Sequence, residues 1–339
     1  MKKKLFKSIS LLLIMMLMLT ALGGCANESA APAEQAGNES QEEKKMVFGN
    51  ICRSRNDVWN NYSIKAFEYA AEQKGVETIV IDPDGNMEKA VAAMEDLITK
   101  KVDGISVYTM TPELDVTLAQ MAKEAGIPIT FENSLPGEEA EYVGTVACQY
   151  EDIGYAAGKF ISETYPGSKL FYCMGQPGMN ITEPYEEGLH KALEAFGTVE
   201  LVATQPTDWG AEQAMNVTQN LIQSGQEFDV VFANNEQMAT GVLNALKDAG
   251  LDEKVKIVAT GGGPDGLEMI REGEIDATMS APVSLQGLIT FRNLWQHING
   301  KTPEKFTPLP VIPVTKENVE EAVSWEVSPA AVEYIGGLD

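Results

Sequence analysis

The chain has 339 residues, 44% of them hydrophobic and 22% charged, and its formal net charge at pH 7 is −25. So acidic a chain lacks the basic face that nucleic acid binding requires, which excludes nucleic acid as a partner. The N-terminal segments are expected to lie outside the folded part. The number of residues that then remain suits two packed lobes better than one.

The N-terminus has the layout of an export signal. Its first seven residues hold four lysines, and residues 10–22 are almost entirely apolar but too short for a comfortable membrane span. The sequence LGGC at 22–25 resembles the bacterial lipobox, in which the cysteine becomes the lipidated first residue of the mature protein. We therefore predict a signal peptide at 1–24 and a lipid anchor on Cys25. The alternative is an N-terminal anchor helix that stays in the membrane.

Residues 25–45 comprise this cysteine and a segment without any large apolar side chain. Such a segment cannot contribute to a core, so we expect a flexible tether and a folded part that begins near residue 46. Removing residues 1–24, which carry four lysines and no acidic residue, brings the net charge to −29. This charge suits an exported protein that meets small molecules and other proteins.

From residue 46, short β-rich runs alternate with amphipathic segments of about 12 residues. We expect strands at 46–51, 77–82, 104–109, 127–133, 141–147, 168–175, 199–206, 228–235, 255–260 and 277–282. We expect helices at 61–75, 87–101, 114–126, 152–165, 183–197, 211–225, 236–250, 265–273 and 285–300. The alternation predicts an α/β fold with parallel sheets covered on both faces, in two similar halves.

Ligands of such sheets bind beyond the carboxyl ends of the strands, so the segments that follow the strands are the informative ones. One of them, ATGGGPDG, spells G-x-G-x-x-G at 261, 263 and 266, the pattern of a dinucleotide-binding loop. However, Pro264 has no N–H and Asp265 is negative, which suits a pyrophosphate poorly. We interpret the segment as a tight strand-to-helix turn at the edge of a binding cleft.

The residues that could support catalysis or metal binding are few. His190 and His297 lie within expected helices, away from a candidate nucleophile or second metal ligand. Cys52, Cys148 and Cys173 are too widely spaced for a zinc site or a disulfide framework. We predict no enzymatic activity, no cofactor and no metal, and mostly buried free thiols, with a single cysteine pairing left open.

Several segments resemble landmarks of the ribose-type periplasmic sugar-binding proteins of ABC transporters, which have the type I periplasmic-binding-protein fold. They are SIKAFEYAAEQKG, ATQPTDW, MNVTQNLIQ, VFANNEQMATGVLNAL and GGPDG, and the resemblance covers nearly all of 46–314. It implies two Rossmann-like lobes joined by a three-strand hinge, which close on a ligand and dock on a membrane permease. We place the N-terminal lobe at 46–147 plus 283–308 and the C-terminal lobe at 148–282 plus 309–339, with crossings near 146–149, 280–283 and 309–313, and expect a monomer.

Carried over position by position, the resemblance implies ligand-binding residues on both lobes: Asp57, Trp59, Asn60, Glu132, Asn133, Glu183, Trp209, Asn235 and Gly261. Aromatic faces suit the C–H groups of a sugar, and carboxylates and amides suit its hydroxyls. Alternatives remain for several of them: Asp57 and Asn235 as helix caps, the tryptophans as core residues, and the glutamates as solvated side chains.

The chain also departs from the family at the ligand positions. Sugar binders usually carry Asp-Arg where this chain has Glu132 and Asn133, an arginine at Glu183, an aspartate at Gly261 and a glutamine at Ala281. These changes argue against a simple pentose. The carboxylates favour a neutral polyol-like or cationic ligand.

Arg53 and Arg55, in the loop after the first strand, instead favour an anionic group, and the sequence leaves this open. Our hypothesis is an exported substrate-binding lipoprotein of an ABC importer that binds a sugar or polyol. It would lie on the outer face of the cytoplasmic membrane, or in the periplasm if an outer membrane exists. The alternatives are a sensory protein that presents its ligand-bound form to a receptor kinase, and an importer component for a nucleoside or an amine.

Overall fold

The computed structural model describes residues 45–108, 111–178 and 181–339, so the predicted signal peptide and Cys25 lie outside the described residues. The first lobe holds the strands β1 (Val47–Ile51), β2 (Glu77–Ile81), β3 (Gly104–Tyr108), β4 (Ile129–Glu132), β5 (Gly144–Ala147) and β11 (Phe306–Pro308). The second lobe holds β6 (Lys169–Met174), β7 (Glu200–Pro206), β8 (Val230–Ala233), β9 (Lys256–Gly261), β10 (Ala277–Ser280) and β12 (Ile312–Thr315). The strand orders are β11-β5-β4-β3-β1-β2 and β12-β10-β9-β8-β6-β7.

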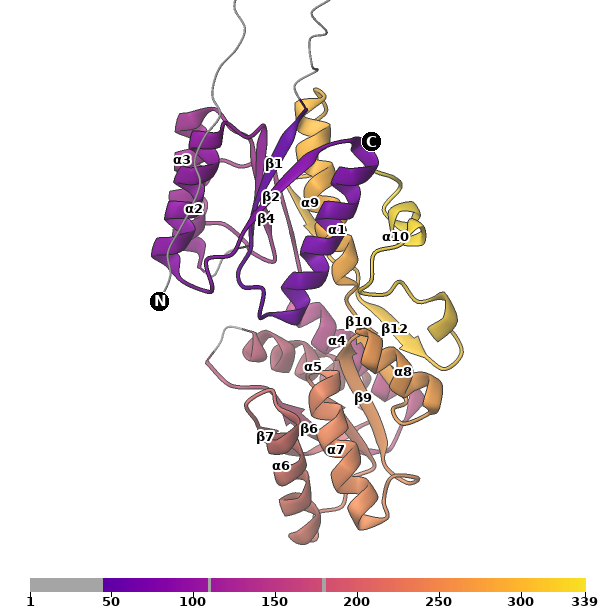
Figure 1. Ribbon diagram of the computed structural model, residues 1–339. Coiled ribbons are helices and arrows are strands. Elements are labelled where there is room, and N and C mark those ends of the chain that lie inside the picture. Colours follow the sequence, from indigo (N-terminus) through magenta and orange to yellow (C-terminus); the bar gives the residue numbers. More distant parts are fainter. Residues whose placement is uncertain (1–44, 109–110, 179–180) are drawn as a thin grey trace, which may run out of the picture. The chain divides into compact units, whose positions relative to one another are not determined.

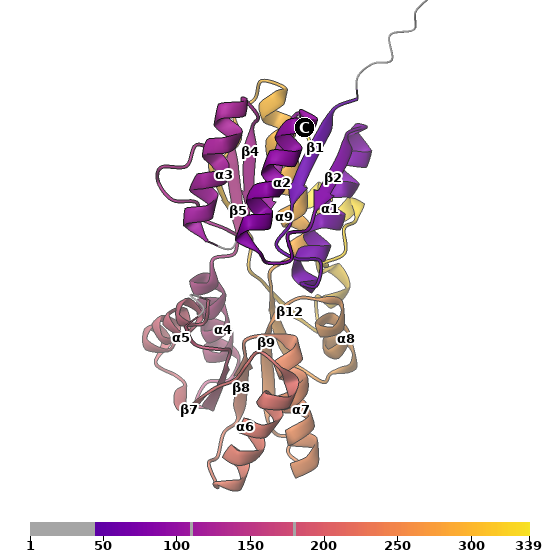
Figure 2. The ribbon, with the colours of Figure 1, turned by 60° about the vertical axis from the view of Figure 1, so that its left-hand side comes forward.

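Helices cover both faces of each sheet, as the parallel strands require. The first lobe carries α1 (Val58–Lys74), α2 (Met87–Lys100), α3 (Pro112–Ala125) and α9 (Val283–Ile298). Figure 1 shows α2 and α3 on one side of its sheet and α1 and α9 on the other. The second lobe carries α4 (Tyr150–Thr164), α5 (Thr182–Phe196), α6 (Ala211–Gln223), α7 (Glu236–Ala249) and α8 (Pro264–Glu272). Figure 2 shows α4 beside α5 and α6 beside α7.

Local signals in the sequence explain where these elements begin and end. Every residue of β3 and β4 is buried, as expected for central strands of a parallel sheet with helices on both faces. The side chain of Asp57 caps α1, and Gly75 ends this helix at a φ of 67°, in the left-handed region that glycine tolerates. The predicted α/β fold with two lobes is confirmed, although β12 pairs antiparallel with β10.

The chain passes between the sheets at three short connections. These are residues 148–149 between β5 and α4, 281–282 between β10 and α9, and 309–311 between β11 and β12. They lie where the hinge was expected. Each connection has only two or three residues, so the elements on either side of it must lie close together.

The C-terminal tail departs from the expected lobe boundary. We expected 309–339 in the second lobe, and the short helix η1 (Val319–Glu321) does pack Val319 into that core. Beyond it, however, α10 (Pro329–Tyr334) packs against α9, and Ala331 and Leu338 are buried in the core of the first lobe. Because these apolar side chains pack into the first-lobe core, the chain crosses between the lobes a fourth time.

The contact between α4 and α5 generates a stability prediction. A Cβ added at Gly188 would lie 1.9 Å from the carbonyl oxygen of Glu151. We therefore expect Gly188→Ala to lower the free energy of unfolding by about 1–3 kcal/mol, as measured by urea denaturation. Glu194→Ala, which adds alanine on the exposed face of the same helix, is the matched control. A Gly188→Ala protein as stable as its parent would contradict the close packing, because alanine otherwise favours helix by about 1 kcal/mol.

Candidate functional site

A cavity of about 450 Å³ lies at the carboxyl ends of strands from both lobes. Its lining is dominated by large aromatic side chains: Trp59, Trp209, Trp325, Tyr108, Tyr150 and Tyr185. Three asparagines and the charged side chains of Arg53, Asp57 and Glu236 supply most of its polar character. Apolar faces combined with a few placed polar groups are the usual lining of a small-molecule site.

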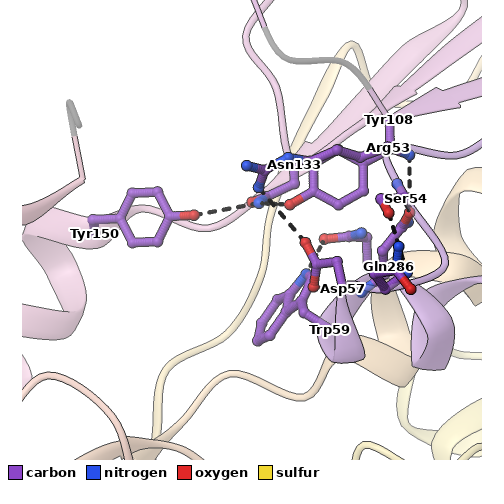
Figure 3. A network of polar contacts seen from close by, with 10 residues as sticks. Arg53, Ser54, Asp57, Trp59, Tyr108, Asn133, Tyr150 and Gln286 are labelled. Atoms are coloured by element: carbon purple, nitrogen blue, oxygen red, sulfur yellow. Dashed lines mark hydrogen bonds and ion pairs between the residues drawn. The ribbon is translucent and has the colours of Figure 1, made fainter. Parts of the chain in front are cut away.

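The loop between β1 and α1 forms part of the first-lobe wall. Asn60 is buried, and its Oδ1 accepts hydrogen bonds from the backbone N–H groups of Arg53 and Ser54, so this side chain shapes the loop. Asp57 caps the helix through the N–H of Asn60 and also lies 3.6 Å from the guanidinium of Arg53. Figure 3 shows Arg53 and Asp57 together with Tyr108 and Asn133. The one cation of the described lining is therefore already paired with a carboxylate.

Trp59 is held in place by a chain of polar contacts that ends at a buried carboxylate. Its Nε1–H donates to Oε1 of Gln286 at 3.3 Å, as Figure 3 shows. Nε2 of Gln286 in turn donates to Glu132, which is 1% exposed and does not line the cavity. The carboxylate of Glu132 accepts hydrogen bonds from Asn50, Ser63, Ser106 and Gln286. Glu132 thus helps to position Trp59 through Gln286 but is not itself part of the cavity wall.

Asn133 connects the two lobes across the cavity. Its Nδ2 donates to the hydroxyl of Tyr108 at 2.8 Å in the first lobe and to the hydroxyl of Tyr150 at 3.3 Å in the second. Figure 3 shows the Tyr150 hydroxyl directed at Asn133. Burial raises the pKa of Tyr108 to about 12, so the phenol stays protonated and remains a donor at neutral pH.

The second-lobe wall is built around Trp209. A Cβ added at Gly175 would lie 2.4 Å from the Trp209 ring, so only glycine leaves room for the indole against the end of β6. Trp209 has a φ of 70°, and its carbonyl accepts a hydrogen bond from Nδ2 of Asn235 at 3.2 Å. Asn235 also caps α7 through the N–H of Met238. Asn235 therefore both lines the cavity and fixes the loop that carries Trp209.

Asn234 belongs to the cavity lining and carries a buried hydrogen-bond donor without a partner among the described residues. Its Oδ1 accepts from the hydroxyl of Tyr172 at 2.8 Å and from the N–H of Gly175 at 2.9 Å, which fixes the orientation of the amide. The side chain is 2% exposed, and among the described residues its Nδ2 has no hydrogen-bond partner. A buried donor without a partner is costly, so a bound acceptor there would be stabilised.

The glycine-rich turn wraps an internal carboxylate. β9 ends at Gly261 and α8 begins at Pro264, and a Cβ added at Gly261 would lie 2.2 Å from an oxygen of Glu236. That carboxylate accepts hydrogen bonds from the N–H of Gly262 and from the Thr278 hydroxyl. The space and the amide that a phosphate would need are thus already used by Glu236, so the turn does not fit a dinucleotide.

The structure separates the nine predicted ligand-binding residues into two groups. Those that line the cavity are Asp57, Trp59, Asn133, Trp209, Asn235 and Gly261. Those that do not are Asn60, Glu132 and Glu183. Glu183 is exposed at the start of α5, where its Oε1 accepts from the N–H of Gly178 at 2.6 Å.

Of the two arginines considered, Arg53 lines the cavity, whereas Arg55 is exposed outside it. The sequence reasoning missed Tyr108, Tyr150, Tyr185, Asn234, Glu236 and Trp325. For three of these a signal existed: Tyr108 and Asn234 lie one residue before the end of a predicted strand, and Glu236 directly follows one. The position of Trp325 in the tail carried no such signal.

Other reactive groups are sparse in the part of the chain that the structure describes. Cys52, Cys148 and Cys173 are free thiols, and burial raises the pKa of Cys148, which lines the cavity, to about 12. Within the described ranges, no group of three or more His, Cys, Asp or Glu side chains is arranged to hold a metal ion. None of the helices in these ranges is both long and apolar enough to span a membrane.

Comparison with known proteins finds clear relatives. The model of the family "Periplasmic binding protein domain" matches residues 48–302. The ribose import binding protein of Bacillus subtilis (strain 168) is 25% identical over 307 residues, which covers 90% of this chain and 97% of that protein.

Two crystal structures of ABC transporter solute-binding proteins are also similar. One, from Actinobacillus succinogenes 130z with bound D-allose, has a TM-score of 0.72 and 25% identity over 82% of this chain and 100% of that one. The other, from Bacillus halodurans C-125 with bound myo-inositol, has a TM-score of 0.69 and 26% identity over 82% and 96%.

Glu236 generates a pH prediction. Burial raises its pKa to about 7, although hydrogen bonds from Thr278 and Gly262 favour the ionised form. In an unfolded chain the pKa of the same carboxyl is about 4.3. Between these pH values the folded protein holds a proton that the unfolded chain has lost, so the contribution of Glu236 to stability falls as pH rises through this window.

Glu236→Gln removes this titration. We therefore expect the stability of the parent relative to this variant to fall by on the order of 3 kcal/mol between pH 4.5 and 7.5, as measured by urea denaturation at each pH. Glu212→Gln, at the exposed start of α6, is the matched control and should show no such trend. A difference between parent and Glu236→Gln that does not change with pH would contradict the assignment.

Proposed function

Because this chain belongs to the periplasmic binding protein family, we propose that it is the lipid-anchored substrate-binding protein of an ABC importer, and that it binds a neutral sugar or polyol in the cavity between its lobes. The family places it outside the cytoplasm, and its relatives are solute-binding proteins and not enzymes. The proposal extends this to the nature of the ligand, the anchor and the transport partner.

The unpaired Nδ2 of Asn234 among aromatic faces is the observation that carries the choice of ligand. A sugar or polyol hydroxyl can accept this hydrogen bond, while the ring C–H groups lie against indole and phenol faces. Asp57, Asn133 and Asn235 border the same space and can pair with further hydroxyls. A purely apolar ligand would leave the buried donor unsatisfied.

The charges of the described lining favour a neutral ligand over an anionic one. The first lobe contributes one cation, Arg53, which is paired with Asp57 at 3.6 Å. The second lobe contributes no cation to the described lining and adds the buried carboxyl of Glu236. A phosphate or carboxylate ligand would therefore lose its hydration without a free cation in return. The relatives named above are described with ribose, D-allose and myo-inositol, which are all neutral.

Binding from both lobes supports a closure mechanism. The cavity lining comes from both sheets, and the first three connections between the lobes have only two or three residues each. A ligand that contacts both walls stabilises the arrangement in which the walls are close, and thereby selects it. The ligand-bound monomer then presents one surface from each lobe to the permease.

The ligand proposal is tested with a protein that lacks residues 1–45. We expect isothermal titration with D-allose, myo-inositol and D-ribose to show binding of at least one, and no binding of D-ribose 5-phosphate. Asn234→Asp keeps the acceptor oxygen but replaces the unpaired donor, so affinity for the bound sugar should fall by about tenfold or more, ~1.4 kcal/mol. Asn220→Asp on the exposed face of α6 is the matched control. Tight binding of the phosphate, or equal affinity of Asn234→Asp and the parent, would refute the proposed ligand class.

The anchor proposal concerns Cys25. In bacteria fed labelled palmitate, we expect the full-length chain to carry label and to sediment with membranes, because two or more acyl chains give firm anchoring. Cys25→Ser should lose the label, whereas Cys52→Ser, which changes a buried free thiol, should keep it. Label that persists in the Cys25→Ser protein would show that another residue carries the lipid, and a full-length chain without label would contradict the lipid anchor.

A further inference from the structure

The segment between η1 and α10 touches both lobes beside the cavity. At its start, Ala322 packs against the core of the second lobe, and directly afterwards Val323 packs against the core of the first. The hydroxyl of Ser284, at the start of α9, donates to the carbonyl of Ser324 at 2.7 Å and fixes the segment there. The next residue, Trp325, is half-buried and lines the cavity.

Contacts on two sides determine where the Trp325 indole lies. Its Nε1–H donates to the carbonyl of Gly261 at 2.8 Å, at the end of β9 in the second lobe. Its ring meets Trp59 edge-on, with centroids 5.1 Å apart, and Tyr62 at 5.8 Å, both on α1 of the first lobe. A Cβ added at Gly263 would lie 3.4 Å from the same ring, so the glycine-rich turn forms its other boundary.

Trp59 and Trp325 together form an aromatic corner in the lining of the cavity. Each indole has a single donor, and both donors are already used within the protein, by Gln286 for Trp59 and by Gly261 for Trp325. An indole is a donor only and has no other polar group to offer. This corner can therefore recognise an uncharged ligand only through contact with the faces and edges of its rings.

We propose that Trp325 is a specificity-determining residue, whose ring contacts the C–H face of an uncharged cyclic ligand at the corner that it forms with Trp59. The inference rests on the proposed binding of a sugar or polyol in this cavity and names a residue that selects among such ligands. A cyclic polyol with several C–H groups on one face satisfies such a corner, because the rings replace water over that face. The segment that carries Trp325 lies outside the 48–302 region that the family model matches.

The experiment separates the ring of Trp325 from its hydrogen bond. Dissociation constants for D-allose and myo-inositol are measured by titration for the parent without residues 1–45 and for two variants. Trp325→Ala removes both ring and donor, and we expect affinity to fall by about tenfold or more. Trp325→Phe keeps an aromatic face but loses the bond to Gly261, and we expect it to stay within about threefold of the parent. Urea denaturation of each variant shows whether it is folded.

Trp295→Ala is the matched control, because Trp295 stacks on Phe291 in the core of the first lobe and does not line the cavity. It should leave sugar affinity unchanged. If folded Trp325→Ala binds the sugars as tightly as the parent, this inference is overturned and the proposed function is not. An equal loss of sugar affinity in Trp325→Ala and Trp325→Phe would also overturn the inference. The indole would then act only through its hydrogen bond to the carbonyl of Gly261 and not through contact with the ligand. A parent that binds neither sugar would overturn this inference for these sugars, and one that also fails to bind D-ribose would overturn the proposed function with it.

Discussion

The first-lobe wall of the cavity depends on the hydrogen bonds that the buried carboxylate of Glu132 accepts. A charge removed from water is tolerated only where enough donors surround it, and here four side chains donate to it. They come from β1, α1, β3 and α9, so one group fixes elements that lie far apart in the sequence. α9 joins this lobe only after the chain has returned from the second lobe. Through Gln286 on α9, the carboxylate therefore also links the segment that follows the second connection between the lobes to the cavity wall that carries Trp59.

A second buried carboxyl plays the corresponding part in the other lobe. Glu236, at the first turn of α7, is enclosed by the turn between β9 and α8 and by Thr278 on β10. Glycine is needed at Gly261, where the turn begins, and at Gly266 in the first part of α8, because a side chain at either position would collide with Glu236. Gly261 in turn offers its carbonyl to Trp325. The loop that looks like a nucleotide-binding motif thus encloses the buried carboxyl of Glu236 and holds Trp325 in the cavity wall.

Much of the fold could be predicted from the sequence because local rules decide it. Apolar runs, caps such as Asp57 and stops such as Gly75 define the helices and strands within a few residues. The rule that ligands bind beyond the carboxyl ends of parallel strands found cavity-lining positions such as Asn133 and Trp209. These positions depend mainly on where strands end, which is local information.

The errors arise where distant partners decide the outcome. Whether a polar residue after a strand faces the cavity or the interior depends on contacts such as that between Glu132 and Gln286, 154 residues apart. The end of the tail was assigned to the wrong lobe, because Ala331 and Leu338 are buried in the first-lobe core, among residues far away in the sequence. Trp325 was missed for the same reason, since its contacts with Gly261 and Trp59 are visible only in three dimensions.

A crystal structure of residues 46–339 saturated with the sugar that binds most tightly is the most direct measurement. The account predicts density for one sugar in the cavity, within van der Waals distance of Trp59 and Trp209 and with an oxygen at hydrogen-bond distance from Nδ2 of Asn234. Contacts from both lobes to the same molecule would show that the ligand bridges the two walls, as the closure mechanism requires. Density that touches one lobe only, or that lies outside the cavity, would contradict the central claim that the two walls form a single binding site.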